Sequence, residues 1–211
     1  MRKKKMMKLR HTLPVVLVAI SGFAVSCSSA EPEDASIAVV ESPEAVWVPG
    51  PAGLSIPTGA QGPYELDPVP HEWEESPQGA AMAAVAAQVY MAGADDDTWT
   101  DVSRFMLEPG AGRDQWLQAR ALVTVDGVVD NPAQFTGFSV AEYDEEADKA
   151  LIILATTWSD GVSFAYPVQL SRTSGDWKVV LPTQDQAPDL TALSEQQLDG
   201  FIAFTSVEDE R

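Results

Sequence analysis

The chain has little cysteine and little histidine, the residues that metal sites and nucleophilic catalysis most often use. It has one cysteine, Cys27, and two histidines in 211 residues. A single cysteine excludes a disulfide within the chain, so the fold must be stabilised by burial. Structural zinc sites need several His or Cys ligands, which the chain cannot supply. His71 lies in a proline-rich stretch beside Glu72 with no nucleophile motif, so we expect no catalytic triad and no metal centre.

Basic residues are scarce beyond the first ten positions. Six of the 13 Lys and Arg residues precede Cys27, whereas all 32 Asp and Glu residues follow it. From Cys27 onward, seven positive charges therefore stand against 32 negative ones, a formal charge of −25. Phosphates and anionic lipid headgroups repel such a chain, which excludes nucleic acid as a partner. We interpret the acidity as a means of keeping an exposed surface soluble.

No apolar run reaches the ~20 residues that a membrane-spanning helix needs. The N-terminal run covers 13–25 and follows a stretch with six Lys and Arg residues. It ends in Ala24-Val25-Ser26-Cys27, with small residues just before the cysteine. This order is typical of a signal peptide, which we expect to cover residues 1–26. An uncleaved anchor and an ordinary secretory signal with an incidental cysteine are the alternatives.

The end of this segment resembles the bacterial lipobox, although Ala24 stands where a leucine is usual. The resemblance implies that the Cys27 thiol receives diacylglycerol. Acyl chains such as palmitate would then anchor the protein to the cell membrane on its extracytoplasmic face. An acylated Cys27 leaves no thiolate for catalysis.

Composition divides the rest of the chain into four parts. Residues 27–45 are rich in Ser, Glu, Pro and Ala, and we expect a disordered acidic tether there. Residues 46–75 are rich in Pro and Gly but carry Trp47, which predicts an extended arm pinned to the domain surface. A folded domain is expected over 76–204, followed by an acidic C-terminal tail over 205–211.

The domain is organised around one alanine-rich helix. Ser76 suits an N-cap, Pro77 suits the first helical position, and Gly93 suits a left-handed C-cap. Between Gln78 and Gly93 the one polar side chain without apolar character is Gln88. A helix that is apolar all round and too short to span a bilayer belongs to the core.

Helical patterns come first in the expected domain and strands follow. Two further helices are predicted over 99–106 and 113–122, and residues 123–129 are a weak strand start broken by Asp126-Gly127. Four runs rich in β-branched and aromatic residues then predict an antiparallel meander, at 133–143, 149–158, 162–171 and 177–181. The second run is apolar on both faces and should be central, while Pro167 should make part of the third run an edge or a bulge. A brief helix opens at Ser194 with a capping box, and residues 201–204 close against the body.

The expected class is therefore α+β, with N-terminal helices packed on a curved antiparallel meander. This arrangement resembles the cystatin-like, nuclear-transport-factor-like cone. Gly62-Pro63 and the helix start Ser76-Pro77-Gln78-Gly79-Ala80 are also similar to a group of actinobacterial secreted or lipid-anchored proteins, some of which accompany conjugative elements. The resemblance implies an extracytoplasmic scaffold rather than an enzyme.

Three other sets of residues carry groups that a binding or catalytic site uses, but none of them completes a known motif. Calcium ligands are offered by 95–97 with Asp101 and by 144–146 with Asp148, but neither set follows an EF-hand loop, and solvated turns are the simpler interpretation. The cone fold also houses isomerases, and Tyr90, Tyr143 and Tyr166 are candidates to line such a cavity, although no acid in an apolar helix supplies a base. Four tryptophans suit a stacking surface but are more simply core or rim residues: Trp99, Trp116, Trp158 and Trp177.

We thus interpret the chain as a lipid-anchored, non-enzymatic interaction or scaffold module of the cell envelope, and the resemblance implies a role accessory to conjugative transfer. It would contact the membrane through Cys27 and an envelope protein through its domain, without a cofactor. The alternative is a small-ligand-binding or isomerase-like pocket between the alanine-rich helix and the sheet.

The anchor interpretation predicts that Cys27→Ala abolishes membrane retention, because no other residue would carry the lipid. Fractionation of cells into membrane and soluble parts measures this, with Ser29→Ala as a neighbouring control. A Cys27→Ala protein that still sediments with membranes would show that the lipobox interpretation is wrong.

Overall fold

The computed structural model describes residues 40–206, which belong to one compact unit. The predicted signal peptide, Cys27 and most of the predicted tether lie outside the described residues, as do the last five residues of the chain. Within residues 40–206, no helix has the length and apolarity that crossing a membrane requires.

The described chain begins with a β-hairpin. Strands β1 (Glu44–Pro49) and β2 (Ser55–Gly59) pair antiparallel across the 3-10 turn η1 (Pro51–Gly53). The short strand β9 (Thr205–Ser206) runs parallel to β1 on its other edge, which gives a sheet of order β2-β1-β9. The expectation of N-terminal helices is therefore wrong, because two strands precede every helix of the described chain.

The hairpin also shifts the expected boundaries of the folded part. Ala45 and Ile56 are buried, so this segment is a structural layer rather than a tether end and a surface arm. Ser42 donates a hydrogen bond to the Ala203 carbonyl, and its hydroxyl lies 2.6 Å from that of Thr205. The fold therefore begins before residue 45, and the start of the predicted tail belongs to β9.

Helix α1 (Pro77–Gly93) is buried along most of its length, as the sequence predicts, with eleven of its 17 residues inaccessible. The Ser76 hydroxyl accepts a hydrogen bond from the Gly79 amide at 3.0 Å, which confirms the N-cap. The predicted left-handed cap is wrong, since the helix continues through Gly93 and Ala94 follows in an extended conformation. Gly93 instead allows close approach, because a Cβ there would lie 3.1 Å from the Pro51 carbonyl oxygen.

Two shorter helices follow, and both were expected from the apolar spacing. They are α2 (Trp99–Phe105) and α3 (Ala111–Arg120). Residues 121–133 then form a long connection without a strand, so the weak strand start at 123–129 is not realised. Asp126 and Gly127 explain this result, because both residue types favour turns.

The predicted meander forms the larger sheet. Its strands β6-β5-β4-β3-β8 lie in this order, and β7 pairs with β5. Their bounds are β3 (Gln134–Asp144), β4 (Lys149–Thr157), β5 (Ser163–Ser171), β6 (Lys178–Val179), β7 (Thr191–Leu193) and β8 (Ile202–Ala203). Strand β4 is central, as its apolar pattern predicts. Pro167 pairs with Ile153 of β4 and faces the gap between β7 and β6 on its other side, which confirms an edge position.

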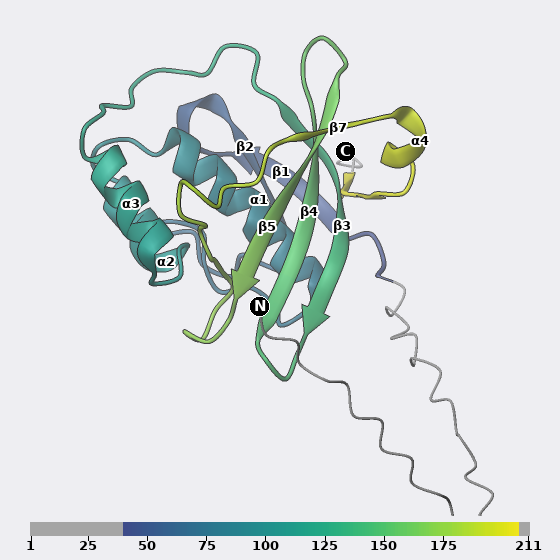
Figure 1. Cartoon of the computed structure of the whole chain (residues 1–211), viewed down its shortest axis with the longest axis horizontal. Coiled ribbons are helices and arrows are strands. Elements are labelled where there is room, and N and C mark those ends of the chain that lie inside the picture. The colour runs from purple at the N-terminus through teal and green to yellow at the C-terminus, as the bar shows by residue number, and fades with distance from the viewer. Residues whose placement is uncertain (1–39, 207–211) are drawn as a thin grey trace, which may run out of the picture. The chain divides into compact units, whose positions relative to one another are not determined.

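Figure 1 shows α1 between the two sheets, with β1 and β2 behind it and β3, β4 and β5 in front. The described residues thus form a mixed α+β fold with two open sheets. The last helix, α4 (Glu195–Leu198), carries the predicted capping box between Ser194 and Gln197. Phe204 then links both sheets, with its ring centroid 5.7 Å from Trp47 and 5.1 Å from Phe138.

The position of α1 predicts that Val85→Asp destabilises the fold by more than ~3 kcal/mol, because Val85 is fully buried and the carboxylate would have no partner. Urea denaturation measures the change. Val123→Asp is the matched control, since Val123 is exposed and should tolerate the same substitution. Equal stability of the two variants would show that α1 is not the core element.

Candidate functional site

One pocket opens beside the C-terminal half of α1, where the hairpin and the start of β3 meet the helix. We call it the Gln88 pocket. Its lining residues are Trp47, Gly53, Leu54, Ser55, Gln88, Val89, Ala92, Val129, Pro132, Ala133, Gln134 and Phe135. The two sheets and the long connection 121–133 all contribute, so the pocket exists only in the assembled fold.

Gln88 is the polar residue that interrupts the alanine-rich helix. Its Nε2 atom is buried and has no hydrogen-bond partner among the described residues. A buried amide donor without a partner costs about 1–3 kcal/mol, so natural proteins keep few of them. Gln88 also lines the pocket, and rotation about its terminal side-chain bond, which is a soft torsion, would turn this donor toward a ligand there.

The pocket is uncharged and of moderate size. None of its lining residues carries a charge, although the chain as a whole is strongly acidic. Its volume is about 240 Å³. An apolar cavity of ~150 Å³ accommodates a benzene ring, so this pocket holds one ring-sized group or slightly more. The geometry suits an uncharged, mainly apolar group with one hydrogen-bonding atom.

Exposed apolar side chains gather around the opening of the pocket. Val128 and Val129 are 74% and 42% exposed, and Trp158 and Val162 in the β4–β5 turn are 49% and 41% exposed. Pro132 and Gln134 line both the Gln88 pocket and a neighbouring hollow beside Trp158. The two groups are therefore adjacent, and we call this surface the apolar rim: Val128, Val129, Pro132, Trp158 and Val162.

Backbone contacts hold the connection that carries half of this rim. The Val129 amide donates to the Ala52 carbonyl at 2.9 Å, which ties the connection to η1. Gly53 has a φ of 75° in this turn, and a Cβ on it would collide with the Val128 side chain. A glycine is therefore required at position 53 for conformation as well as for space.

The rim connection begins at a buried arginine. Arg120 is 6% exposed, and its guanidinium donates to the Ala94 carbonyl at 2.9 Å, the Val123 carbonyl at 2.7 Å and the Asp96 carboxylate at 2.9 Å. The hydrogen bond from Arg120 is the largest cause that lowers the pKa of Asp96. All these contacts are within the protein, so Arg120 fixes the end of α3 against the end of α1.

The model of a family described as a domain of unknown function, DUF8175, matches residues 17–203. The chain belongs to the DUF8175 family. Neither the curated proteins nor the solved structures include a significant match to it. The family description assigns no activity to this DUF8175 member.

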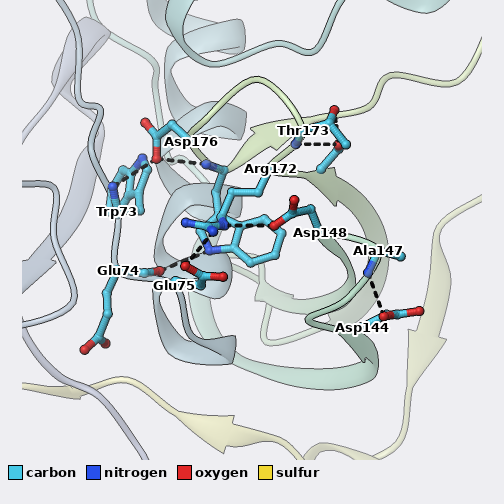
Figure 2. Close-up of polar contacts among 11 residues, drawn as sticks. Trp73, Glu74, Glu75, Asp144, Ala147, Asp148, Arg172, Thr173 and Asp176 are labelled. Atoms are coloured by element: carbon cyan, nitrogen blue, oxygen red, sulfur yellow. Dashed lines mark hydrogen bonds and ion pairs between the residues drawn. The ribbon is translucent and has the colours of Figure 1, made fainter.

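A second polar cluster, shown in Figure 2, joins the loop before α1 to the β5–β6 turn. Asp176 accepts hydrogen bonds from the backbone amides of Glu72 at 2.7 Å, Trp73 at 3.0 Å and Trp177 at 2.8 Å. The Trp177 indole N–H donates to the Glu74 carbonyl at 3.0 Å. These contacts connect segments about a hundred residues apart, so the cluster stabilises the fold.

Arg172 extends this cluster toward the β3–β4 turn. Its guanidinium lies 2.5 Å from the Glu75 carboxylate and 3.4 Å from that of Asp148, as Figure 2 shows. It also lies over the Trp177 ring at 5.8 Å. With one cation between two carboxylates, this is a structural ion-pair network rather than a reactive centre.

The three candidate tyrosines do not converge on one cavity. Tyr90 borders a polar depression with Asp95 and Asp126, on the other side of η1 from the Gln88 pocket. Tyr143 packs against Trp177, with ring centroids 5.9 Å apart, and Tyr166 lies in β5 against the core. Burial raises the pKa of all three phenols, as expected for packing residues.

The acidic groups and His71 make local contacts. Hydrogen bonding from the Thr98 side chain is the largest cause that lowers the pKa of Asp95, followed by the bond from the Thr98 amide, and the Asp97 amide also donates to this carboxylate. Asp144 accepts a hydrogen bond from the Ala147 amide. Among the described residues no cluster of potential ligands can hold a metal ion. The His71 ring packs against that of Phe105 at a tilt of 42°, with ring centroids 4.7 Å apart, and its Nδ1 lies 2.8 Å from the Val69 carbonyl.

The tryptophans divide between core and surface. Trp177 is buried, and Trp99 and Trp116 are half-buried with ring centroids 6.3 Å apart. Trp158 is the exposed member and belongs to the apolar rim. Gln88 was not predicted as a site residue from the sequence, although its signal was present as a single amide within an apolar helix.

The Asp176 cluster predicts that Asp176→Ala destabilises the protein by about 2–4 kcal/mol, since three backbone donors lose a charged acceptor. Asp176→Asn should cost less, because its carbonyl oxygen still accepts. Chemical denaturation of both variants tests the order. A loss that is equal for Ala and Asn would mean that the charge, and not the acceptor geometry, matters.

Proposed function

We propose that this DUF8175 protein is a lipid-anchored, extracytoplasmic and non-enzymatic module that binds a partner protein of the cell envelope through its apolar rim. The rim is the observation that supports the proposal. Single exposed apolar residues are ordinary, but adjacent ones around a pocket are typical of interaction sites.

The position of the rim supports a protein partner rather than the bilayer. The chain enters the fold beside the start of α1, where the Gln78 amide donates to the Glu41 carbonyl at 3.3 Å. Val89, which lines the pocket, lies eleven residues further along the helix, or about 16 Å at 1.5 Å per residue. A tether leaving from Glu41 toward a lipid on Cys27 would leave the rim accessible at the other end of α1.

The strong negative charge agrees with this view. A formal charge of −25 beyond the signal peptide opposes close contact with anionic headgroups. It favours a partner whose contacting surface is basic around an apolar centre. Attachment through Cys27 would then keep the module near the membrane while its acidic body projects away.

The proposal also includes a relation to the cystatin-like fold and a relation to a group of secreted proteins. One long helix against an antiparallel β3-β4-β5 meander supports a relation to the cystatin-like cone, although the hairpin behind α1 is an addition. A relation to actinobacterial secreted proteins of conjugative elements rests on the Gly-Pro and helix-start motifs. A role accessory to conjugative transfer would follow from that relation.

Ligand binding is the second candidate function, and the Gln88 pocket is the observation that favours it. No comparable observation favours an isomerase-like activity in this pocket. Its tyrosines lie apart, and the pocket lining contains no acid that would act as a base.

Crosslinking in native membranes tests the interaction proposal. The tagged full-length lipoprotein should give one reproducible crosslinked species, which falls at least tenfold for the double variant Val128→Ser/Trp158→Ser. The control is Leu66→Ser/Leu190→Ser, because these leucines are similarly exposed but lie outside the rim. The two double variants must have equal melting temperatures, so that a lower crosslinked yield reflects lost binding and not unfolding. An identical crosslinked yield for both doubles would overturn the rim as the binding surface.

A further inference from the structure

The Gln88 pocket opens within the apolar rim, so its occupant follows from the chemistry of both. We propose that it receives one uncharged aromatic side chain of the partner protein, in a segment that carries Lys or Arg next to that residue. This inference rests on the proposed function and names what the same surface recognises.

The size and shape of the pocket favour a side chain. Its volume of about 240 Å³ is below the ~300–1,000 Å³ usual for free small-molecule sites, but it exceeds what a single ring needs. Trp47 and Phe135 in its lining offer aromatic surfaces for stacking or edge contacts. Binding hot spots are commonly aromatic anchors seated in such pockets.

The unpaired amide accounts for the polar part of the recognition. The Gln88 Nε2 atom is buried in this conformation, but Gln88 lines the pocket, and rotation about its soft terminal torsion would let it donate to a carbonyl that the partner segment brings in. The contact removes the cost of a buried donor without a partner. A hydrocarbon surface such as a lipid chain offers no acceptor and would leave that cost in place.

The charge around the opening sets the flanking residues. Residues 121–133 contain two acids, Asp126 and Asp130, and no Lys or Arg. Both carboxylates are exposed, and Asp130 follows Val129 of the pocket wall directly. Because the wall itself is uncharged and Asp126 borders the depression on the other side of η1, Asp130 is the acid beside the pocket, and it favours a cation next to the inserted ring.

Peptide binding to the full-length lipoprotein in nanodiscs tests the proposal. The probes are Ac-Lys-Trp-Lys-NH2, Ac-Glu-Trp-Glu-NH2, Ac-Lys-Ala-Lys-NH2 and free indole, observed by saturation-transfer NMR. We expect saturation of the indole protons of the first peptide, at least threefold weaker binding of the second, and no binding of the third. Free indole should bind at least tenfold more weakly than the first peptide.

Two pocket variants locate the binding. Ala92→Leu fills the pocket from an exposed helix position and should weaken the first peptide at least tenfold, whereas Ala119→Leu on exposed α3 surface should not. Gln88→Leu keeps the size of the side chain and should weaken binding about fivefold, as expected for one hydrogen bond. Unchanged affinity in Ala92→Leu would overturn the pocket as the site.

The remaining outcomes distinguish a failure of the pocket proposal from a failure of the proposed interaction function. Indole that binds as tightly as the peptide would make this a small-molecule site and overturn the proposed occupant. Equal binding of the Lys and Glu peptides would overturn the basic flank. A crosslinked partner that persists in Ala92→Leu but is lost in Val128→Ser/Trp158→Ser would overturn the pocket proposal and leave the interaction function standing. Peptide binding without any rim-dependent partner would overturn the interaction function and leave the pocket's preference for an aromatic group with a basic flank standing.

Discussion

The fold depends on covering one alanine-rich helix on all sides. The alanine side chain is a single methyl group, so the covering strands must approach the α1 backbone closely. Two layers are needed because no face of the helix is polar. The β3-β4-β5 meander supplies one layer and the β1–β2 hairpin supplies the other. Glycine marks the close approaches: a Cβ on Gly50 would lie 3.4 Å from Val89, and one on Gly93 would lie 3.1 Å from the Pro51 carbonyl oxygen. Where Gln88 interrupts the apolar helix, the cover is incomplete and a pocket opens.

Much of this fold could be predicted from local chemistry. The Ser76 cap, the Ser194 capping box and the position of Pro167 at a strand edge each follow from what one residue can donate, accept or exclude. The central place of β4 follows from apolar residues on both of its faces. These signals are contained in short stretches, and distant residues do not override them.

The hairpin and the site were harder to predict from the sequence because both depend on tertiary contacts. Pro49, Pro57 and three glycines make residues 46–59 look like a loop, and only contact with α1 makes them a layer. The all-apolar helix did require a second cover, so the need for another layer was present in the sequence even though its source was not. Gln88 was visible as an exception in the helix, but the pocket that it lines is completed by Trp47 of β1 and by Pro132 and Phe135 about 45 residues further along the chain.

Both ends of α1 are fixed by polar contacts, and this bears on how the rim would bind. At the start of the helix, Asp176 and Trp177 hold the preceding loop, and at its end Arg120 holds the Ala94 carbonyl. The connection that carries Val128 and Val129 is tied to Ala52 by a backbone hydrogen bond. A surface fixed in this way loses little conformational entropy when a partner docks, so even a small apolar contact yields usable affinity. The contacts that stabilise both ends of α1 therefore also hold in place the helix that carries the Gln88 pocket.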